Sequence, residues 1–302
     1  MKKFLALLLA LTMALALVAC GGGDDAASDT TADSGDDAAA STGEFEEMTW
    51  KFACSATETS PWVDGAKEFA RIVGEKTGGA ITVQYYPADQ LTAGNQTDGI
   101  QALMDGTTEL SMHSNLIWSS FDQRFNVVSL PFLFSSTEEA DAALDGEALG
   151  EILESTYNVH LLGIAENGFR HITNSKHAIA SKADMNGLKM RVAGSQLLNR
   201  SYELWGADYT NANWSEVFTA LQTGTYDGQE NPLPTADAAS IQEVQSYLTY
   251  WTGAYDCLFF CMNAELYNSL SPELQAIVDE AGQAACEYER ELNRSQDQEI
   301  MD

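Results

Sequence analysis

Residues 168–200 carry a positive charge that the rest of this acidic sequence lacks. The chain of 302 residues has 45 acidic and 15 basic residues, for a formal net charge of −30. Six of the bases fall in this segment, with Asp184 as its only acid: Arg170, Lys176, Lys182, Lys189, Arg191 and Arg200. A local positive potential of this kind favours a bound anion. The alternative is a solvated basic face that balances acidic neighbours in space.

Arg191 is the base best placed to bind an anion. In the predicted strand at residues 188–192, Lys189 and Arg191 share one face and the apolar residues share the other. Arg191 stands near the carboxyl end of that strand, where ligands bind in open α/β sheets. A helix predicted from residue 196 adds backbone N–H donors. Because a guanidinium can bind a carboxylate through two parallel hydrogen bonds, we expect a small carboxylate-bearing molecule here.

No catalytic or metal-binding template fits the sequence. Residues 193–197 lack the second glycine of a G-x-S-x-G elbow, and there is no Walker A, G-x-G-x-x-G or H-E-x-x-H motif. The four histidines are scattered, and no Cys/His cluster has zinc spacing. We therefore expect a protein that is not an enzyme and that holds no metal or cofactor.

Strands and helices alternate along residues 48–302. The pattern predicts strands at residues 49–53, 81–86, 110–113, 159–165, 188–192 and 255–262. It predicts helices at residues 61–76, 95–104, 136–157, 196–205, 214–222, 236–243 and 272 to about 293. This alternation indicates an α/β fold with mainly parallel sheets covered by helices.

The N-terminal residues are predicted to be a signal and a tether. Two lysines precede an apolar run at residues 4–18, and Cys20 follows a small-residue cleavage site. This resembles a bacterial lipoprotein signal, in which residues 1–19 are removed and Cys20 is lipidated. Residues 20–47 form an acidic, flexible tether too poor in apolar residues to fold. The alternative is an ordinary secretory signal with an accidental cysteine.

Composition excludes two further classes of protein. The acid excess argues against a nucleic-acid binder, which needs a basic surface. Only the apolar run at the start approaches membrane-spanning length, which excludes a multi-span membrane protein. An extracellular location would permit disulfides, and Cys54 could pair with Cys257 or Cys261, which also lie in strand-like runs. For the four remaining cysteines we favour buried free thiols: Cys54, Cys257, Cys261 and Cys286.

Residues 182–234 contain the motifs that point to a family. Residues 184–192, DMNGLKMRV, resemble the D-x-x-G-L-K-x-R-V segment of TRAP-transporter substrate-binding proteins of the DctP type. Residues 214–224 and 226–232 are similar to that family's S-E-V-Y-x-A-L-Q-x-G and V-D-G-Q-E-N-P segments. Residues 168–170 match its G-x-R segment. The resemblance covers roughly residues 48–300.

The resemblance implies a two-lobe, periplasmic-binding-protein-like α/β fold with crossing strands and a cleft between the lobes. Lobe I would comprise residues 48–167 and 256–296, and lobe II residues 168–255 and 297–302. Family members usually continue for several dozen residues beyond the long C-terminal helix. We therefore expect part of the covering of lobe II to be missing.

The resemblance also implies a receptor for a small organic acid. Arg191 would form a salt bridge with the ligand carboxylate, supported by Arg170, Asn231 and Trp214. The alternative roles are a lobe-to-lobe ion pair for Arg170, a turn position for Asn231 and core packing for Trp214.

Residues 113–118 occupy the region where the other lobe of such receptors faces the ligand. This segment matches no sequence motif shared across the family. We therefore expect Asn115 and Trp118 to contribute to the choice of ligand.

The implied partners are the small four-span and large twelve-span TRAP membrane subunits. The protein would work extracytoplasmically, anchored by lipid to the bacterial cell membrane. The rival classes are an ABC-type solute-binding lipoprotein, a ligand-sensing receptor and a secreted hydrolase.

Overall fold

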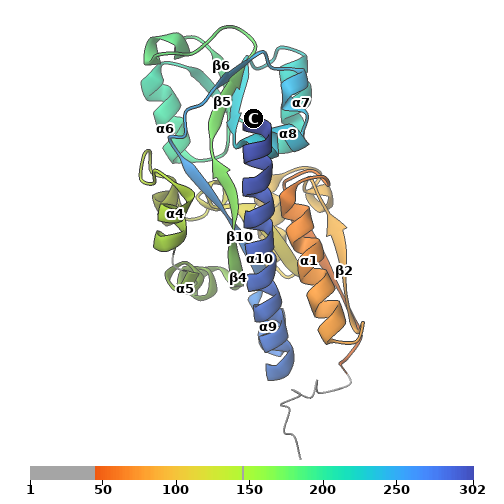
Figure 1. The fold of residues 1–302 in the computed structure, drawn as a ribbon. Coiled ribbons are helices and arrows are strands. Elements are labelled where there is room, and N and C mark those ends of the chain that lie inside the picture. The colour runs from red at the N-terminus through yellow and green to blue at the C-terminus, as the bar shows by residue number, and fades with distance from the viewer. Residues whose placement is uncertain (1–44, 145) are drawn as a thin grey trace, which may run out of the picture. The chain divides into compact units, whose positions relative to one another are not determined.

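Two five-stranded sheets organise the part of the chain described by the computed structural model, residues 45–144 and 146–302 (Figure 1). The predicted signal peptide, Cys20 and the tether up to residue 44 lie outside the described residues. In the described residues, no helix is both long enough and apolar enough to cross a membrane.

The first sheet, called sheet A, has the strand order β2-β1-β3-β10-β4. Its strands are β1 (Met48–Cys54), β2 (Ile81–Tyr86), β3 (Leu110–Ser114), β4 (Val159–Phe169) and β10 (Tyr255–Asn263). β1 runs parallel to β2 and β3, whereas β10 runs antiparallel to β3 and β4. All nine residues of β10 are buried, as expected for an apolar strand covered on both faces.

The second sheet, called sheet B, has the strand order β7-β6-β8-β5-β9. Its strands are β5 (His171–Asn174), β6 (Lys189–Val192), β7 (Asp208–Asn211), β8 (Gly228–Asn231) and β9 (Tyr247–Thr249). β6 runs parallel to β7 and β8, and β5 runs antiparallel to β8 and β9. Both sheets are therefore mixed, and the expectation of mainly parallel sheets was too simple.

Two segments carry the chain from one sheet to the other. β4 ends at Phe169 and β5 begins at His171, which leaves Arg170 at the passage. The return runs from β9 into β10, next to the same passage, because Tyr255 pairs with Phe169 and Thr249 pairs with Ile172. These paired passages confirm the expected crossing strands.

Helices cover the sheets. They are α1 (Pro61–Lys76), α2 (Gln96–Met104), α3 (Asn115–Trp118), α4 (Thr137–Ala143), α5 (Gly146–Tyr157), α6 (Gln196–Trp205), α7 (Trp214–Gln222), α8 (Leu233–Ala238), α9 (Ala264–Ser269) and α10 (Pro272–Met301). Short 3₁₀ turns lie at Gln90–Thr92, Gln123–Ser129, Lys182–Met185 and Ile241–Glu243.

Two predicted helices differ from the structure. The helix expected at residues 136–157 is divided into α4 and α5, because the backbone of Leu144 is extended. The helix expected at residues 236–243 begins earlier as α8 and finishes as a separate 3₁₀ turn. Ser240 between them has a positive φ of 56°, which no α-helix tolerates.

Helix α10 connects the two halves of the fold. It lies beside α1 and against β4 of sheet A, and its C-terminal part reaches α8 (Figure 1). Apolar side chains from α1, α10 and β10 bury one face of sheet A, and a second core on its other face includes Trp118, Phe125 and Phe259. Cys54, Cys257, Cys261 and Cys286 are buried and free, which confirms the expected thiols.

Candidate functional site

A cavity with about 340 Å³ of empty space, part of it open to solvent, lies between elements of the two sheets. Sheet A and its helices contribute Ser55, Ala56, Trp62, Gln96, Ser114, Ile117 and Asn167 to the wall. Sheet B and its helices contribute Arg191, Ala193, Trp214, Asn231 and Thr235, and Arg170 joins from the passage between the sheets. Four residues that the sequence pointed to therefore meet in this one wall: Arg170, Arg191, Trp214 and Asn231.

Arg191 is a buried cation with no carboxylate partner among the described residues. It is 2% exposed, on β6. Its Nε and Nη2 atoms donate to the carbonyl oxygen of Ala212 over 2.9 and 2.7 Å. Burial, partly opposed by the negative charge of Glu230, lowers the pKa of the guanidinium to about 10, so it stays protonated at neutral pH. A buried charge without a counter-ion is costly, and an anion in the cavity would relieve that cost.

Besides the Ala212 carbonyl, the ring of Trp214 contacts the guanidinium of Arg191. Trp214 is the first residue of α7, and its ring centroid lies 5.4 Å from Arg191 Cζ, within reach of a cation–π interaction. Its backbone N–H donates to Gln96 Oε1 over 3.2 Å, which ties α7 to α2 of the sheet A side. Trp214 therefore both orients the guanidinium and joins the two walls of the cavity.

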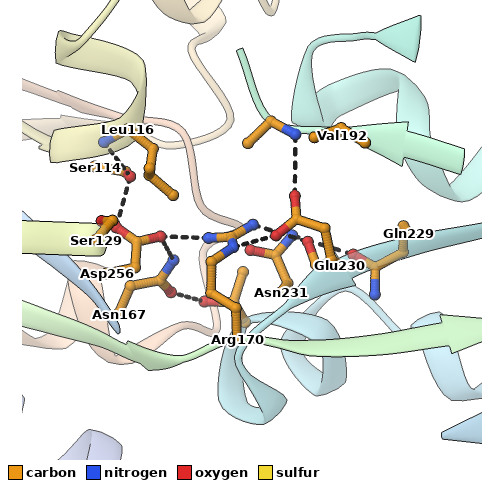
Figure 2. A network of polar contacts seen from close by, with 12 residues as sticks. Ser114, Leu116, Ser129, Asn167, Arg170, Val192, Gln229, Glu230, Asn231 and Asp256 are labelled. Carbon is orange, nitrogen blue, oxygen red and sulfur yellow. Dashed lines mark hydrogen bonds and ion pairs between the residues drawn. The ribbon is translucent and has the colours of Figure 1, made fainter. Parts of the chain in front are cut away.

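Arg170 is neutralised within the protein. Its Nε donates to Glu230 Oε2 on β8, and its Nη1 donates to Asp256 Oδ2 on β10 (Figure 2). Its Nη2 also donates to the carbonyl oxygen of Glu230 over 2.8 Å. Burial alone would lower the pKa of Arg170, but the charges of Glu230 and Asp256 outweigh it and raise that pKa. Arg170 lines the cavity, yet its geometry is that of a bridge between the sheets.

The two acids of the D-G-Q-E-N-P segment, Asp227 and Glu230, bind the backbone at the two ends of β6. Glu230 Oε1 accepts from the backbone N–H of Ala193 over 3.0 Å, at the end of β6 (Figure 2). Asp227 Oδ2 accepts from the backbone N–H of Lys189 over 3.0 Å, at the start of the same strand. Both carboxylates thus fix the strand that carries Arg191.

Asn231 ends β8 and lines the cavity. Its Nδ2 donates to Gln229 Oε1 over 3.2 Å, and its backbone pairs with His171 of β5. It stands beside Arg170 in Figure 2. Pro232, directly after it, is the N-cap residue of α8.

Two other bases of this segment pair with acids away from the cavity. Lys176 pairs with Asp227 over 3.2 Å, and Arg200 pairs with Glu203 over 2.8 Å at the surface. His171 adds no charge, because burial and the nearby Arg170 lower its pKa to about 4. Of the two arginines that line the cavity, Arg191 is the one without a carboxylate partner among the described residues.

The structure does not bring Asn115 or Trp118 to the cavity. Asn115 Nδ2 donates to Phe125 O and Ser129 Oγ, and its Oδ1 accepts from the backbone N–H of Cys257. Trp118 is fully buried in the aromatic core. The segment forms α3, whose turn directs Ile117 into the cavity wall and these two side chains into the core.

Sequence reasoning missed the contributions of the sheet A side. Ser55 follows β1, Trp62 stands in the first turn of α1, and Gln96 begins α2. Each lies near the end of a strand or the start of a helix, where α/β folds place ligand contacts. Position near a strand end or a helix start can be predicted from the sequence, but many residues that do not line the cavity share it. Across the described residues, no cluster of three or more His, Cys, Asp or Glu side chains could hold a metal ion.

The family assignment follows from the sequence profile of the DctP family, described as bacterial extracellular solute-binding protein, family 7. It matches residues 52–302. The chain belongs to this family. The profile match includes β10, α10 and every residue of the cavity wall, so the family assignment and the site rest on the same part of the molecule.

Relatives of known name agree with that assignment. The chain is 30% identical over 268 residues to the 2,3-diketo-L-gulonate-binding periplasmic protein YiaO of Escherichia coli K12, covering 88% of this chain and 81% of that protein. The structure of the sugar acid binding protein DctPAm from Advenella mimigardefordensis, in complex with galactonate, superposes with a TM-score of 0.80 at 29% identity. It covers 85% of this chain and 83% of that one.

A third family member broadens the range of ligands among the relatives. The TRAP periplasmic solute-binding protein of Sulfurospirillum deleyianum, with bound succinate, superposes with a TM-score of 0.78 at 29% identity. It covers 85% of this chain and 83% of that chain. The two-lobe fold of these receptors is therefore the fold of this chain.

Proposed function

We propose that this protein captures a small organic acid by its carboxylate at Arg191 and delivers it to TRAP membrane subunits for uptake driven by an ion gradient. The observation that carries the proposal is the buried Arg191 guanidinium, which lines the cavity and has no carboxylate partner among the described residues. Relatives that bind galactonate and succinate support the ligand class, since both are carboxylates.

Binding would depend on neutralising Arg191. The Ala212 carbonyl and the Trp214 ring hold the guanidinium in place. The side chain of Arg191 therefore loses little conformational entropy when a carboxylate binds. Enclosure between the two sheets excludes water and strengthens the ionic hydrogen bonds. Asn231 would add a polar contact, while Arg170 would hold the two sheets together rather than bind the ligand. This is capture without chemical change.

The partners and the location are part of the proposal. The closed receptor would be recognised by a small four-span and a large twelve-span membrane subunit of the TRAP type. Cys20 would carry the lipid that anchors the protein outside the cytoplasm. Replacing Cys20 by Ser should release the protein from the membrane fraction and abolish its labelling by a fatty acid. Retention of both in the variant would contradict the anchor.

A thermal-shift screen against organic acids, followed by calorimetry on the best ligands, tests the binding function. We expect at least one carboxylic acid to raise the unfolding temperature and to bind with a dissociation constant in about the micromolar range or tighter, whereas its amide does not. Equal binding of acid and amide would show that charge is not recognised. Turnover of any ligand would favour an enzyme instead.

A further inference from the structure

We propose that the acid bound in this cavity is a hydroxylated monocarboxylate, whose hydroxyl groups hydrogen bond to Ser55 and Trp62 while Arg191 binds its carboxylate. The inference rests on the proposed function and restricts the class of organic acid that the receptor would bind. It distinguishes sugar-acid-like ligands from dicarboxylates and from plain aliphatic acids, all of which contain a carboxylate that Arg191 could bind.

The charge in the cavity wall favours one carboxylate rather than two. Arg170 and Arg191 are the charged residues that line it. Arg170 already faces two acids, Glu230 and Asp256. Arg191 is left as one positive charge for the ligand. A second carboxylate would be buried without a cation, near two negative groups, and such a burial is strongly unfavourable.

Unused hydrogen-bonding groups mark where the rest of the ligand would bind. Ser55 and Trp62 are each 3% exposed, and neither Ser55 Oγ nor Trp62 Nε1 has a hydrogen-bond partner in the described part of the chain. Other buried polar atoms lack partners as well, but these two belong to residues that also line the cavity. A buried donor without a partner costs free energy, which a ligand oxygen would restore.

The other polar groups of the wall are already engaged. Ser114 Oγ donates to Asp256 Oδ1 over 2.6 Å, and Asn167 Oδ1 accepts from Thr235 Oγ1 over 2.5 Å. Gln96 Oε1 accepts from the backbone N–H of Trp214. Of the buried side-chain atoms without a hydrogen-bond partner in the described residues, Ser55 Oγ and Trp62 Nε1 are the two in this wall.

The chemistry of these two groups selects a hydroxyl. The indole N–H of Trp62 is only a donor, so it needs a ligand oxygen, and the Ser55 hydroxyl can donate or accept. A hydroxyl group satisfies both, whereas an alkyl chain satisfies neither. A site built to bind a hydroxyl rejects analogues that lack it.

Calorimetry with acids of matched chain length tests the inference. A four-carbon set contains D-erythronate, butyrate and succinate, and a six-carbon set contains D-galactonate, hexanoate and adipate. In at least one set, the hydroxylated monocarboxylate should bind about 100-fold more tightly than both of its counterparts. If an aliphatic or dicarboxylic acid binds as tightly, the inference is overturned while the receptor function stands. If none of the six acids binds, the inference is overturned, and the receptor function is decided separately by the thermal-shift screen.

Variants separate ligand contacts from structural effects. Ser55→Ala and Trp62→Phe should each reduce the preference for the hydroxy acid over its aliphatic counterpart by about 10-fold. The matched controls are Ser60→Ala and Trp50→Phe, because Ser60 Oγ and Trp50 Nε1 are equally buried and unpartnered but do not line the cavity. The controls should leave the preference unchanged. An equal loss in a control and its partner variant would overturn the inference.

Discussion

Arg170 and Asp256 form a buried ion pair across the passage between the two sheets. Arg170 stands between β4 and β5, and Asp256 lies on β10 of sheet A (Figure 2). The same guanidinium pairs with Glu230 on β8 of sheet B. One side chain therefore pairs with an acid from each sheet, whereas Arg191, the other cation of the cavity wall, has no carboxylate partner among the described residues.

Removing the Arg170 guanidinium should destabilise the fold strongly. In Arg170→Met, Asp256 and Glu230 remain buried without their cation, so the free energy of unfolding should fall by about 3–5 kcal/mol. Arg170→Lys, which keeps the charge but loses the fork, should lie between this variant and the wild type. Denaturant unfolding followed by circular dichroism measures these differences.

The matched control for Arg170 is Arg200→Met. Arg200 also belongs to the basic segment and also forms an ion pair, but it and its partner Glu203 are exposed. Its loss should cost about 0–1 kcal/mol. Equal effects at positions 170 and 200 would show that the buried bridge adds no stability.

Glu289 should make stability depend on pH. This residue of α10 is fully buried, its Oε2 accepts from the backbone N–H of Glu166 over 2.8 Å, and burial raises its pKa well above the ordinary 4.5. The folded protein therefore keeps Glu289 protonated where the unfolded chain ionises it. Its contribution is fully present below about pH 4.5 and is lost as the pH rises toward the raised pKa.

Replacing Glu289 by Gln should remove the loss of stability that the ionisation of Glu289 causes at higher pH. The stability of the variant relative to the wild type should increase with pH from 5 to 7, by up to about 1.4 kcal/mol per pH unit. Unfolding curves at several pH values measure the difference between the two proteins. Glu291→Gln, at an exposed position on the same helix, is the control and should show no such trend. A pH-independent difference at position 289 would contradict a protonated carboxyl group.

Gly228 of the D-G-Q-E-N-P segment should not tolerate a side chain. A Cβ there would lie 2.3 Å from the Thr173 carbonyl oxygen and 2.9 Å from Met190 Cε, because β8 is packed between β5 and β6. Gly228→Ala should therefore lower stability by about 1–3 kcal/mol and weaken ligand binding through β6.

Gly74→Ala provides the contrast for Gly228. Gly74 lies inside α1, and its nearest neighbour to a new Cβ is 3.8 Å away. This change should raise stability by about 0.5–1 kcal/mol, since alanine is the better helix former. Thermal unfolding distinguishes the two variants, and a stable Gly228→Ala protein would contradict the close packing of sheet B.

Short-range patterns were enough to single out Arg191, which the structure places in the cavity wall. Alternation along β6 put Arg191 on the polar face, and its place at the carboxyl end of the strand indicated a ligand site. Both arguments need only neighbouring residues. The same holds for α1, because Pro61 and the glycines after Lys76 are local signals of a helix start and a helix end.

Contacts between distant residues could not be predicted in this way. Arg170 meets Asp256, 86 residues later, and nothing near either residue in the sequence indicates that pairing. Whether Asn115 and Trp118 face the cavity depends on how the single turn α3 is rotated about its helix axis. A small rotation decides which side chains face the core and which face the cavity, and the sequence pattern does not fix it.

The most direct test of the account is calorimetric titration of the tightest-binding acid into wild-type protein and into Arg191→Ala, Arg191→Lys and Arg200→Ala. Circular dichroism should show that all four are folded. Arg191→Ala should bind at least about 100-fold more weakly and Arg191→Lys about 10-fold more weakly, with Arg200→Ala unchanged. Wild-type affinity in a folded Arg191→Ala protein would contradict the carboxylate site.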